Sequence, residues 1–286
     1  MSATEPVGEV ASGGGPVLAQ PSERSLLRLL RRGYDWRSLG ALVLLLTTGG
    51  SVGYRWSDLL DANAQMDWLL TAIWIWLAAL ICWRVRGRRD LLMIAVGIGG
   101  GGTIEWWGTN TELWRYFTNE RPPLWILPAW PAATIAIDRM GMLVDEVVKD
   151  RERAWGLALS TAVLARLYYL VVPAFVVWMT AFLWPTVGLL ASQVVIGLMV
   201  LVACFTLDAR RDMALFVAGI SLGLFLEYWG TSRYCWTYYT EQIPPPVAVV
   251  AHGFAAIAFA RCGDGVAWLI DRCVAAVGFR PWFAQG

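Results

Sequence analysis

The chain has 286 residues, of which 57% are hydrophobic and only 16% are charged, and its mean hydropathy is +0.52. This composition predicts an all-α integral membrane protein, because a soluble domain needs more polar surface. The formal net charge is only +1. The chain therefore lacks the excess of positive charge that would favour a nucleic-acid partner, and we expect the lipid bilayer instead.

Several kinds of cofactor are excluded by residues that the chain lacks. Membrane di-iron enzymes and two-histidine haem sites need more than one histidine, and the only histidine is His252. A retinal protein needs a lysine within the membrane, whereas Lys149 lies in the polar run from Asp145 to Arg153. The five cysteines show no metal-ligand spacing. We therefore expect no cofactor and no metal.

The two ends of the chain differ from its apolar middle. The composition predicts a disordered cytoplasmic tail over residues 1–23, a basic interfacial helix over 24–37 and a C-terminal tail over 276–286. Between them lie about eight apolar runs long enough to cross the hydrocarbon core of a bilayer. We expect transmembrane helices at residues 38–56, 66–83, 90–108, 123–140, 165–184, 187–206, 211–230 and 244–262.

The region around the fourth span has three further features. Residues 154–184 are too many for one span, so their first dozen should lie along the inner surface or extend the helix beyond it. Pro128 and Pro131 predict a kink in the fourth span. Asp138 and Arg139, near its inner end, predict an ion pair or a snorkelling arginine at the membrane boundary.

Basic residues indicate the orientation in the membrane. Arginine and lysine cluster before the first span and in every second connection, at residues 84–89, 149–153 and 210–211. Because cytoplasmic loops carry the excess of Lys and Arg, both termini should be cytoplasmic in a multi-pass protein of the inner (cytoplasmic) membrane.

One motif occurs twice, 122 residues apart. The stretch from Gly97 to Thr118 returns as Gly219 to Thr240, with identical Glu-x-Trp-Gly-Thr and Trp-x-Tyr elements. The chain is therefore predicted to consist of two four-span repeats, residues 38–153 and 154–275. Four spans are an even number, so the repeats should be parallel and related by an axis along the membrane normal.

The motif places a carboxylate on a face of small residues. Gly97, Gly101 and Glu105 are four residues apart and so share one side of a helix, as do their counterparts Gly219, Gly223 and Glu227. Small residues let a neighbouring helix or a flat ligand approach closely. A glutamate within a span should face the bundle interior or a cavity. The simpler alternative is that each glutamate only ties a loop to its span.

Aromatic residues accompany both carboxylates: Trp107, Trp114 and Tyr116, and in the second half Trp229, Trp236 and Tyr238. An acid beside aromatic faces suits proton-initiated alkene chemistry, because the acid protonates a double bond and the rings stabilise the carbocation. An interfacial aromatic belt would place the same residues at the same height.

His252 occupies the position of Trp130 in the first repeat. It is either a hydrogen-bonded interior residue or a group that orients or deprotonates a water. If only one half is catalytic, His252 marks the second half.

This pattern, Glu-x-x-Gly-Thr followed by Trp-x-Tyr and a proline-rich start of the next span, resembles the integral membrane carotenoid hydratases of bacteria and archaea, and more distantly the membrane lycopene cyclase domains. The resemblance covers only the motif of each half, and the Glu-Trp-Trp-Gly and Glu-Tyr-Trp-Gly forms differ from the hydratase pattern. The residues that match are Glu105, Gly108, Trp114, Tyr116 and Pro122, and again Glu227, Gly230, Trp236, Tyr238 and Pro244. It implies cofactor-free hydration of a terminal isoprenoid double bond, or cyclisation.

The leading hypothesis is thus a membrane hydro-lyase or intramolecular lyase acting on an apolar isoprenoid or carotenoid. Glu227 and Glu105 are the candidate proton donors, and His252 would orient the water. Candidate substrate-binding residues are Trp229, Trp236, Tyr238, Trp107, Trp114, Tyr116, Gly223 and Gly101. The alternatives are a non-catalytic carotenoid- or lipid-binding membrane subunit and a small-molecule transporter.

Overall fold

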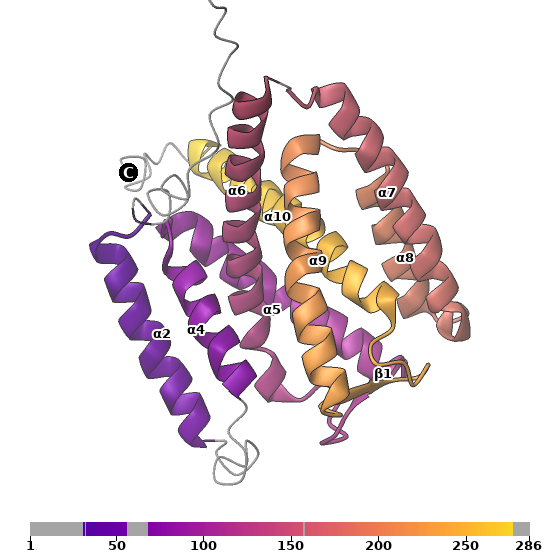
Figure 1. The fold of residues 1–286 in the computed structure, drawn as a ribbon. Helices are drawn as coiled ribbons and strands as arrows, with labels where there is room; N and C mark the ends of the chain where they lie inside the picture. Colours follow the sequence, from indigo (N-terminus) through magenta and orange to yellow (C-terminus); the bar gives the residue numbers. More distant parts are fainter. Residues whose placement is uncertain (1–30, 32, 56–67, 157, 277–286) are drawn as a thin grey trace, which may run out of the picture.

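The computed structural model describes residues 31, 33–55, 68–156 and 158–276, which are almost entirely helical (Figure 1). The predicted all-α class is confirmed. The predicted N-terminal tail, most of the basic helix over 24–37 and nearly all of the C-terminal tail lie outside these residues. The α-helices are α2 (Trp36–Arg55), α4 (Trp68–Cys82), α5 (Gly87–Asn110), α6 (Ala129–Trp155), α7 (Thr161–Phe182), α8 (Leu190–Ala203), α9 (Ala209–Ser232) and α10 (Pro246–Ala276). The short elements are β1 (Trp114–Tyr116), β2 (Trp236–Tyr238) and the 3-10 turns η1 (Leu124–Ile126) and η2 (Trp184–Thr186).

The helix boundaries follow local capping signals. The side chain of Ser160 accepts a hydrogen bond from the backbone N–H of Val163 at the start of α7, and Asp208 caps α9 in the same way through Arg211. These oxygens satisfy N–H groups that have no partner inside the helix. Helix α6 ends at Gly156, whose φ of 63° is in the left-handed region that glycine adopts without strain.

Helix α6 differs from the sequence prediction at both ends. The polar run from Asp145 to Arg153 is not a connection but the last part of α6. Its charge is balanced from α9, where Arg210 contacts Asp145 at 3.1 Å and Glu152 at 2.5 Å. The predicted proline kink is also wrong. Pro128 caps α6 and Pro131 lies in its first turn, where a missing N–H removes no intrahelical hydrogen bond.

Helix α10 is longer than the predicted eighth span. It continues to Ala276, past the expected end at residue 262. An arginine in its middle, Arg261, does not end it because its guanidinium is held by Asp212 of α9 at 2.5 Å. The charge is thus accommodated inside the bundle, where the sequence alone suggested a boundary.

Four helices form the centre of the bundle. Helices α5, α6, α9 and α10 make a closed ring, in which each packs on the next and α10 returns to α5 (Figure 1). The offset of 122 residues carries α5 onto α9 without change in either boundary, and carries the pair α5–α6 onto α9–α10. The remaining helices lie outside this ring: α4 packs on α6, and α7 packs on α9 and α10.

Two loops join at one end of the bundle. Strands β1 and β2 pair antiparallel across the repeats, with Trp114 opposite Tyr238 and Tyr116 opposite Trp236. The central pair, Arg115 and Thr237, occupies equivalent positions of the two repeats, so the pairing is itself two-fold symmetric. We call this end of the bundle the strand end.

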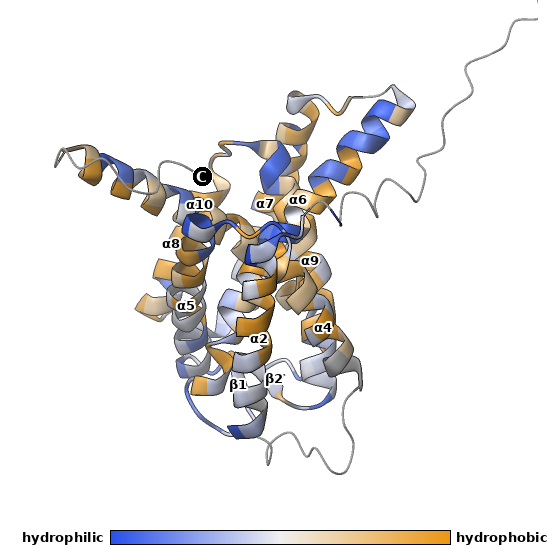
Figure 2. Ribbon diagram, turned by 90° about the vertical axis from the view of Figure 1, so that its left-hand side faces the viewer, coloured by the Kyte–Doolittle hydropathy of each residue, from blue (hydrophilic) through white to orange (hydrophobic). Residues whose placement is uncertain are grey.

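Buried ion pairs lie toward the opposite end, which we call the ion-pair end. Arg139 is fully buried and contacts Asp90 at 2.6 Å and Asp138 at 3.0 Å. The equivalent pair of the second repeat is Arg261 with Asp212. Of the two alternatives predicted for Arg139, the structure shows the ion pair. The side chain does not snorkel to the membrane boundary. Strongly hydrophilic residues gather where α6 ends (Figure 2).

The hydropathy of the helices indicates membrane association. Among the described residues, α7, α9 and α10 are long and apolar enough to cross a membrane. Helices α4 and α8 are apolar but have only 15 and 14 residues. At 1.5 Å per residue they span about 22 Å, less than the roughly 30 Å of the hydrocarbon core.

Candidate functional site

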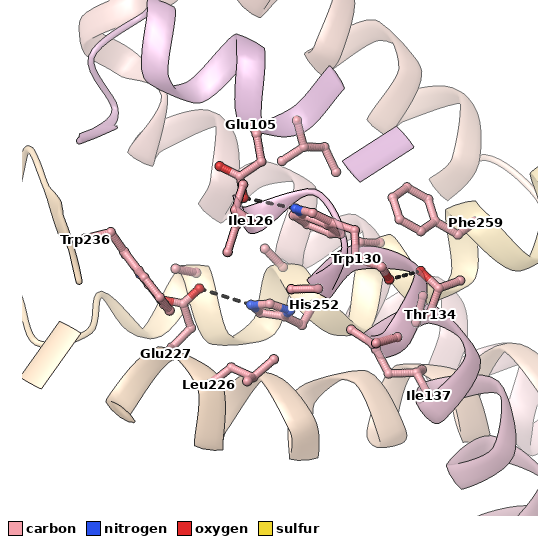
Figure 3. A pocket seen from close by; sticks show the side chains of 18 of the residues that line it. Glu105, Ile126, Trp130, Thr134, Ile137, Leu226, Glu227, Trp236, His252 and Phe259 are labelled. Atoms are coloured by element: carbon pink, nitrogen blue, oxygen red, sulfur yellow. Dashed lines mark hydrogen bonds and ion pairs between the residues drawn. The ribbon is translucent and has the colours of Figure 1, made fainter. Parts of the chain in front are cut away.

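A cavity of about 400 Å³ lies between the four helices of the central ring, with α4 and α7 adding to its walls, which are mostly apolar. Both repeats contribute to it. Apart from Ala132, every lining residue of α6 has its counterpart 122 positions later in α10, and the lining residues of α5 and α9 correspond in the same way. The cavity therefore lies on the pseudo-two-fold axis that relates the repeats, so the chain has one composite site here. Figure 3 shows the carboxyl groups of Glu105 and Glu227 entering it from different helices.

Glu105 of α5 is buried, with 5% of its surface exposed, and accepts three hydrogen bonds. The indole of Trp130 donates to Oε1 at 3.0 Å. The indole of Trp114 and the hydroxyl of Tyr116 donate to Oε2 at 3.1 and 2.9 Å. Both indole groups can only donate, so the carboxylate is matched by fixed donors.

Glu227 of α9 is equally buried and has the same surroundings with one change. Trp236 donates to Oε2 at 3.1 Å, and the hydroxyl of Tyr238 lies 3.0 Å from both oxygens. The third partner is His252, whose Nε2 lies 3.0 Å from Oε1. An imidazole nitrogen either donates or accepts, depending on its tautomer. The carboxyl of Glu227 therefore has a partner with which it can exchange a proton.

Glycines make these contacts possible. A Cβ atom on Gly101 would lie 2.2 Å from the Trp130 ring, and one on Gly223 would lie 2.7 Å from His252. Both glycines were expected to admit a ligand or a neighbouring helix. They admit the side chains that bind the two glutamates, and neither glycine lines the cavity.

Two further glycines hold the tryptophans of the strands. A Cβ atom on Gly108 would lie 1.8 Å from Trp114, and one on Gly230 would lie 1.9 Å from Trp236. Each indole thus lies flat enough against its own helix to reach the glutamate one turn away. This contact explains why Glu, Gly and Trp have the same spacing within each of the two motifs.

The remaining predicted site residues also line the cavity. Trp107 has its indole N–H bound to Ser192 of α8 at 3.1 Å, and Trp229 lies under the guanidinium of Arg233 at 5.7 Å from the ring centroid. Across the repeats, the ring centroids of Trp114 and Tyr238 are 6.0 Å apart and those of Tyr116 and Trp236 are 6.1 Å apart. The aromatic residues of the two motifs therefore form one wall.

Other lining residues were not among the candidates. Asp138 reaches the cavity near the ion-pair end, and Phe259, Trp125 and Ala255 lie along its sides. For three of them the signal is the offset of 122 residues, because their counterparts Ala260, Ile137 and Ala133 line the cavity as well. The counterpart of Trp125 does not line it, so the repeat gives no signal for that residue.

Among the described residues, no group of three or more His, Cys, Asp or Glu side chains is arranged to hold a metal ion. Comparisons with protein-family models, with curated proteins and with solved structures found no match. Two carboxyl groups beside an apolar, aromatic-lined cavity can donate a proton to a bound molecule and stabilise positive charge that forms on it.

Proposed function

We propose that the protein is a membrane-embedded enzyme that adds water to a carbon–carbon double bond of an isoprenoid or carotenoid, without a cofactor. The observation that carries the proposal is the placement of Glu105 and Glu227, both buried and both on the wall of the same apolar cavity. The resemblance of the duplicated motif to membrane carotenoid hydratases supports the same chemistry. A cavity of this size is within the range of small-molecule sites.

In this scheme Glu227 is the acid. Its protonated carboxyl gives the proton to one carbon of the double bond, and the positive charge forms on the other, more substituted carbon. A water adds to that carbon and releases a proton to Nε2 of His252, which returns it to Glu227 across their 3.0 Å contact. The net reaction is the addition of one water, and both side chains regain their starting state.

Glu105 has a different part. Three donors satisfy its oxygens, and Trp130 in the place of His252 neither takes up nor releases a proton. We assign Glu105 to electrostatic stabilisation of the carbocation, together with the faces of Trp114 and Tyr238. Two carboxyl groups whose surroundings differ can divide the acid and anionic roles in this way.

Cyclisation is the alternative outcome of the same protonation. The cation would be captured by a second double bond of the same molecule, and a carbon would then lose a proton to His252 or Glu227. A non-catalytic carotenoid- or lipid-binding subunit is the other alternative, since an apolar cavity also suits a carrier.

The most direct test is to express the gene in a bacterium that makes carotenoids and to analyse the lipid extract by mass spectrometry. Hydration increases the product mass by one water, and cyclisation changes retention and absorption without changing the mass. The Glu227→Gln variant should fold and form no product. An unaltered ligand that is retained by the purified protein would instead support the carrier.

For the membrane arrangement we propose eight spans in two parallel four-helix repeats, with both termini in the cytoplasm. The support is the duplicated helix order and the clusters of Arg and Lys at one end of the bundle. Single cysteines placed at Glu112 and at Lys149 in a cysteine-free chain test it. Only the Glu112 position should react with a membrane-impermeant maleimide applied to intact cells.

A further inference from the structure

The cavity is elongated along the helices. The residues of α5 that line it extend from Trp107 and Glu105 to Met93, and those of α9 extend from Trp229 and Glu227 to the equivalent residue, Leu215. Twelve residues of helix correspond to about 18 Å. The glutamates lie at one end of this length, toward the strands.

The long walls are the facing sides of α6 and α10. Small residues recur there on both helices, with Ala129 and Ala133 on α6 and Ala251 and Ala255 on α10. The only hydroxyl on this part of α6, that of Thr134, is bound to the carbonyl of Trp130 at 2.7 Å (Figure 3). The walls between the two ends thus offer mainly apolar contacts, and their alanines leave room for a chain between the two helices.

The end opposite the glutamates holds a carboxylate that already has charged partners. Asp138 lies there, and its oxygens are already bound by Arg89 at 2.8 Å, by Arg139 at 3.0 Å and by Arg86. Ala260, the counterpart of Asp138 on α10, lies opposite and is buried. The two ends of the cavity therefore differ in chemistry. Among the described lining residues, the carboxyl groups of Glu105 and Glu227 and the imidazole of His252 lie at the strand end, whereas Asp138 and Ala260 lie at the ion-pair end.

We infer that this cavity is a slot for one acyclic apolar chain, which lies lengthwise between α6 and α10 with its reacting end at Glu105 and Glu227. Ala133 and Ala255, three residues past Trp130 and His252, and Ala260, at the far end, set the length of chain that the slot accepts. The direction of the chain rests on the proposed function, whereas the binding of the chain and its dependence on length do not.

The test uses radiolabelled geraniol, farnesol and geranylgeraniol, a series of linear isoprenoid alcohols of increasing length, binding to the purified protein in detergent. In the wild type the affinity should increase with each added unit. Ala255→Phe, only three residues past His252, obstructs even the shortest chain and should lower the affinity for all three alcohols at least about tenfold. Ala133→Phe, on the facing helix, should have the same effect.

The variant Ala260→Phe tests the far end of the cavity. Ala260 is five residues, or about 7.5 Å, farther from the glutamates than Ala255, so its substitution should leave geraniol affinity within about twofold and lower the affinity for the two longer alcohols at least about tenfold. Leu224→Phe, on an exposed position of α9, is the control for added bulk. Equal affinity for all three alcohols, or a loss that is the same for all three in every variant, would overturn the inference. Graded binding without product in the carotenoid-producing host would contradict only the proposed function.

Discussion

Trp130 and His252 occupy equivalent positions of the two repeats, and each places a ring nitrogen 3.0 Å from the Oε1 atom of the glutamate in its own half. The two rings are nearly parallel, with 14° between their planes and 6.5 Å between their centroids. The two halves of the site thus share one geometry and differ in one chemical property, because only the imidazole can exchange a proton.

The first prediction exchanges these two residues. His252→Trp should reduce product formation by roughly 100-fold or more, because general acid–base catalysis contributes at least that factor. The double variant Trp130→His/His252→Trp should recover part of the activity, now through Glu105, and adding Glu105→Gln should abolish the recovery. Product is measured in the carotenoid-producing host. Full activity in His252→Trp would show that the histidine has no part in proton transfer.

The second prediction concerns stability. An amide has one acceptor oxygen, so Glu105→Gln turns an N–H group toward an indole N–H, and one buried donor loses its partner at a cost of about 1–3 kcal/mol. In Glu227→Gln, His252 can adopt the tautomer that accepts from the amide. Thermal unfolding in detergent should therefore show a lower melting temperature for Glu105→Gln than for Glu227→Gln. Equal losses would mean that His252 does not adapt.

The third prediction tests the glycines beneath the tryptophans. Gly108→Ala and Gly230→Ala place a methyl group where Trp114 and Trp236 now lie, and overpacking of this kind costs about 1–3 kcal/mol. The shift should also move each indole away from its glutamate. Gly99→Ala on the same helix as Gly108 is the control, since a Cβ atom there meets no atom within 4 Å. That variant should be as stable as the wild type or more stable.

The fourth prediction concerns the buried arginine. Arg139→Met leaves Asp90 without a charged partner among the described residues, while Asp138 keeps Arg86 and Arg89, and breaking a buried pair costs about 3–5 kcal/mol. Arg153→Met, which removes an exposed pair with Asp150, should leave the melting temperature unchanged. If both variants unfold at the same temperature, the ion-pair end does not contribute to the stability of the bundle.

The sequence predicted the helical class and the approximate place of each helix, because apolar runs are a local property of the chain. It also identified the repeat, and with it the equivalence of Glu105 with Glu227 and of Trp130 with His252. It missed the extension of α6 through Asp145 to Arg153, since the charges there are balanced by Arg210, which is distant in the sequence. The sequence also assigned Gly101 and Gly223 to ligand binding. The residues that lie against these glycines come from other helices, so only the packed structure identifies them.

What the sequence by itself determined is that this chain repeats one motif and places an acid, a glycine and aromatic residues at fixed spacing in each copy. Only the tertiary structure decided that the two copies form one site. The pairing of β1 with β2 and the closure of α5, α6, α9 and α10 into a ring bring Glu105 and Glu227 to the same cavity. The physical reason is that spacing along a helix fixes which side chains share a face, whereas the partner of that face depends on how distant helices pack.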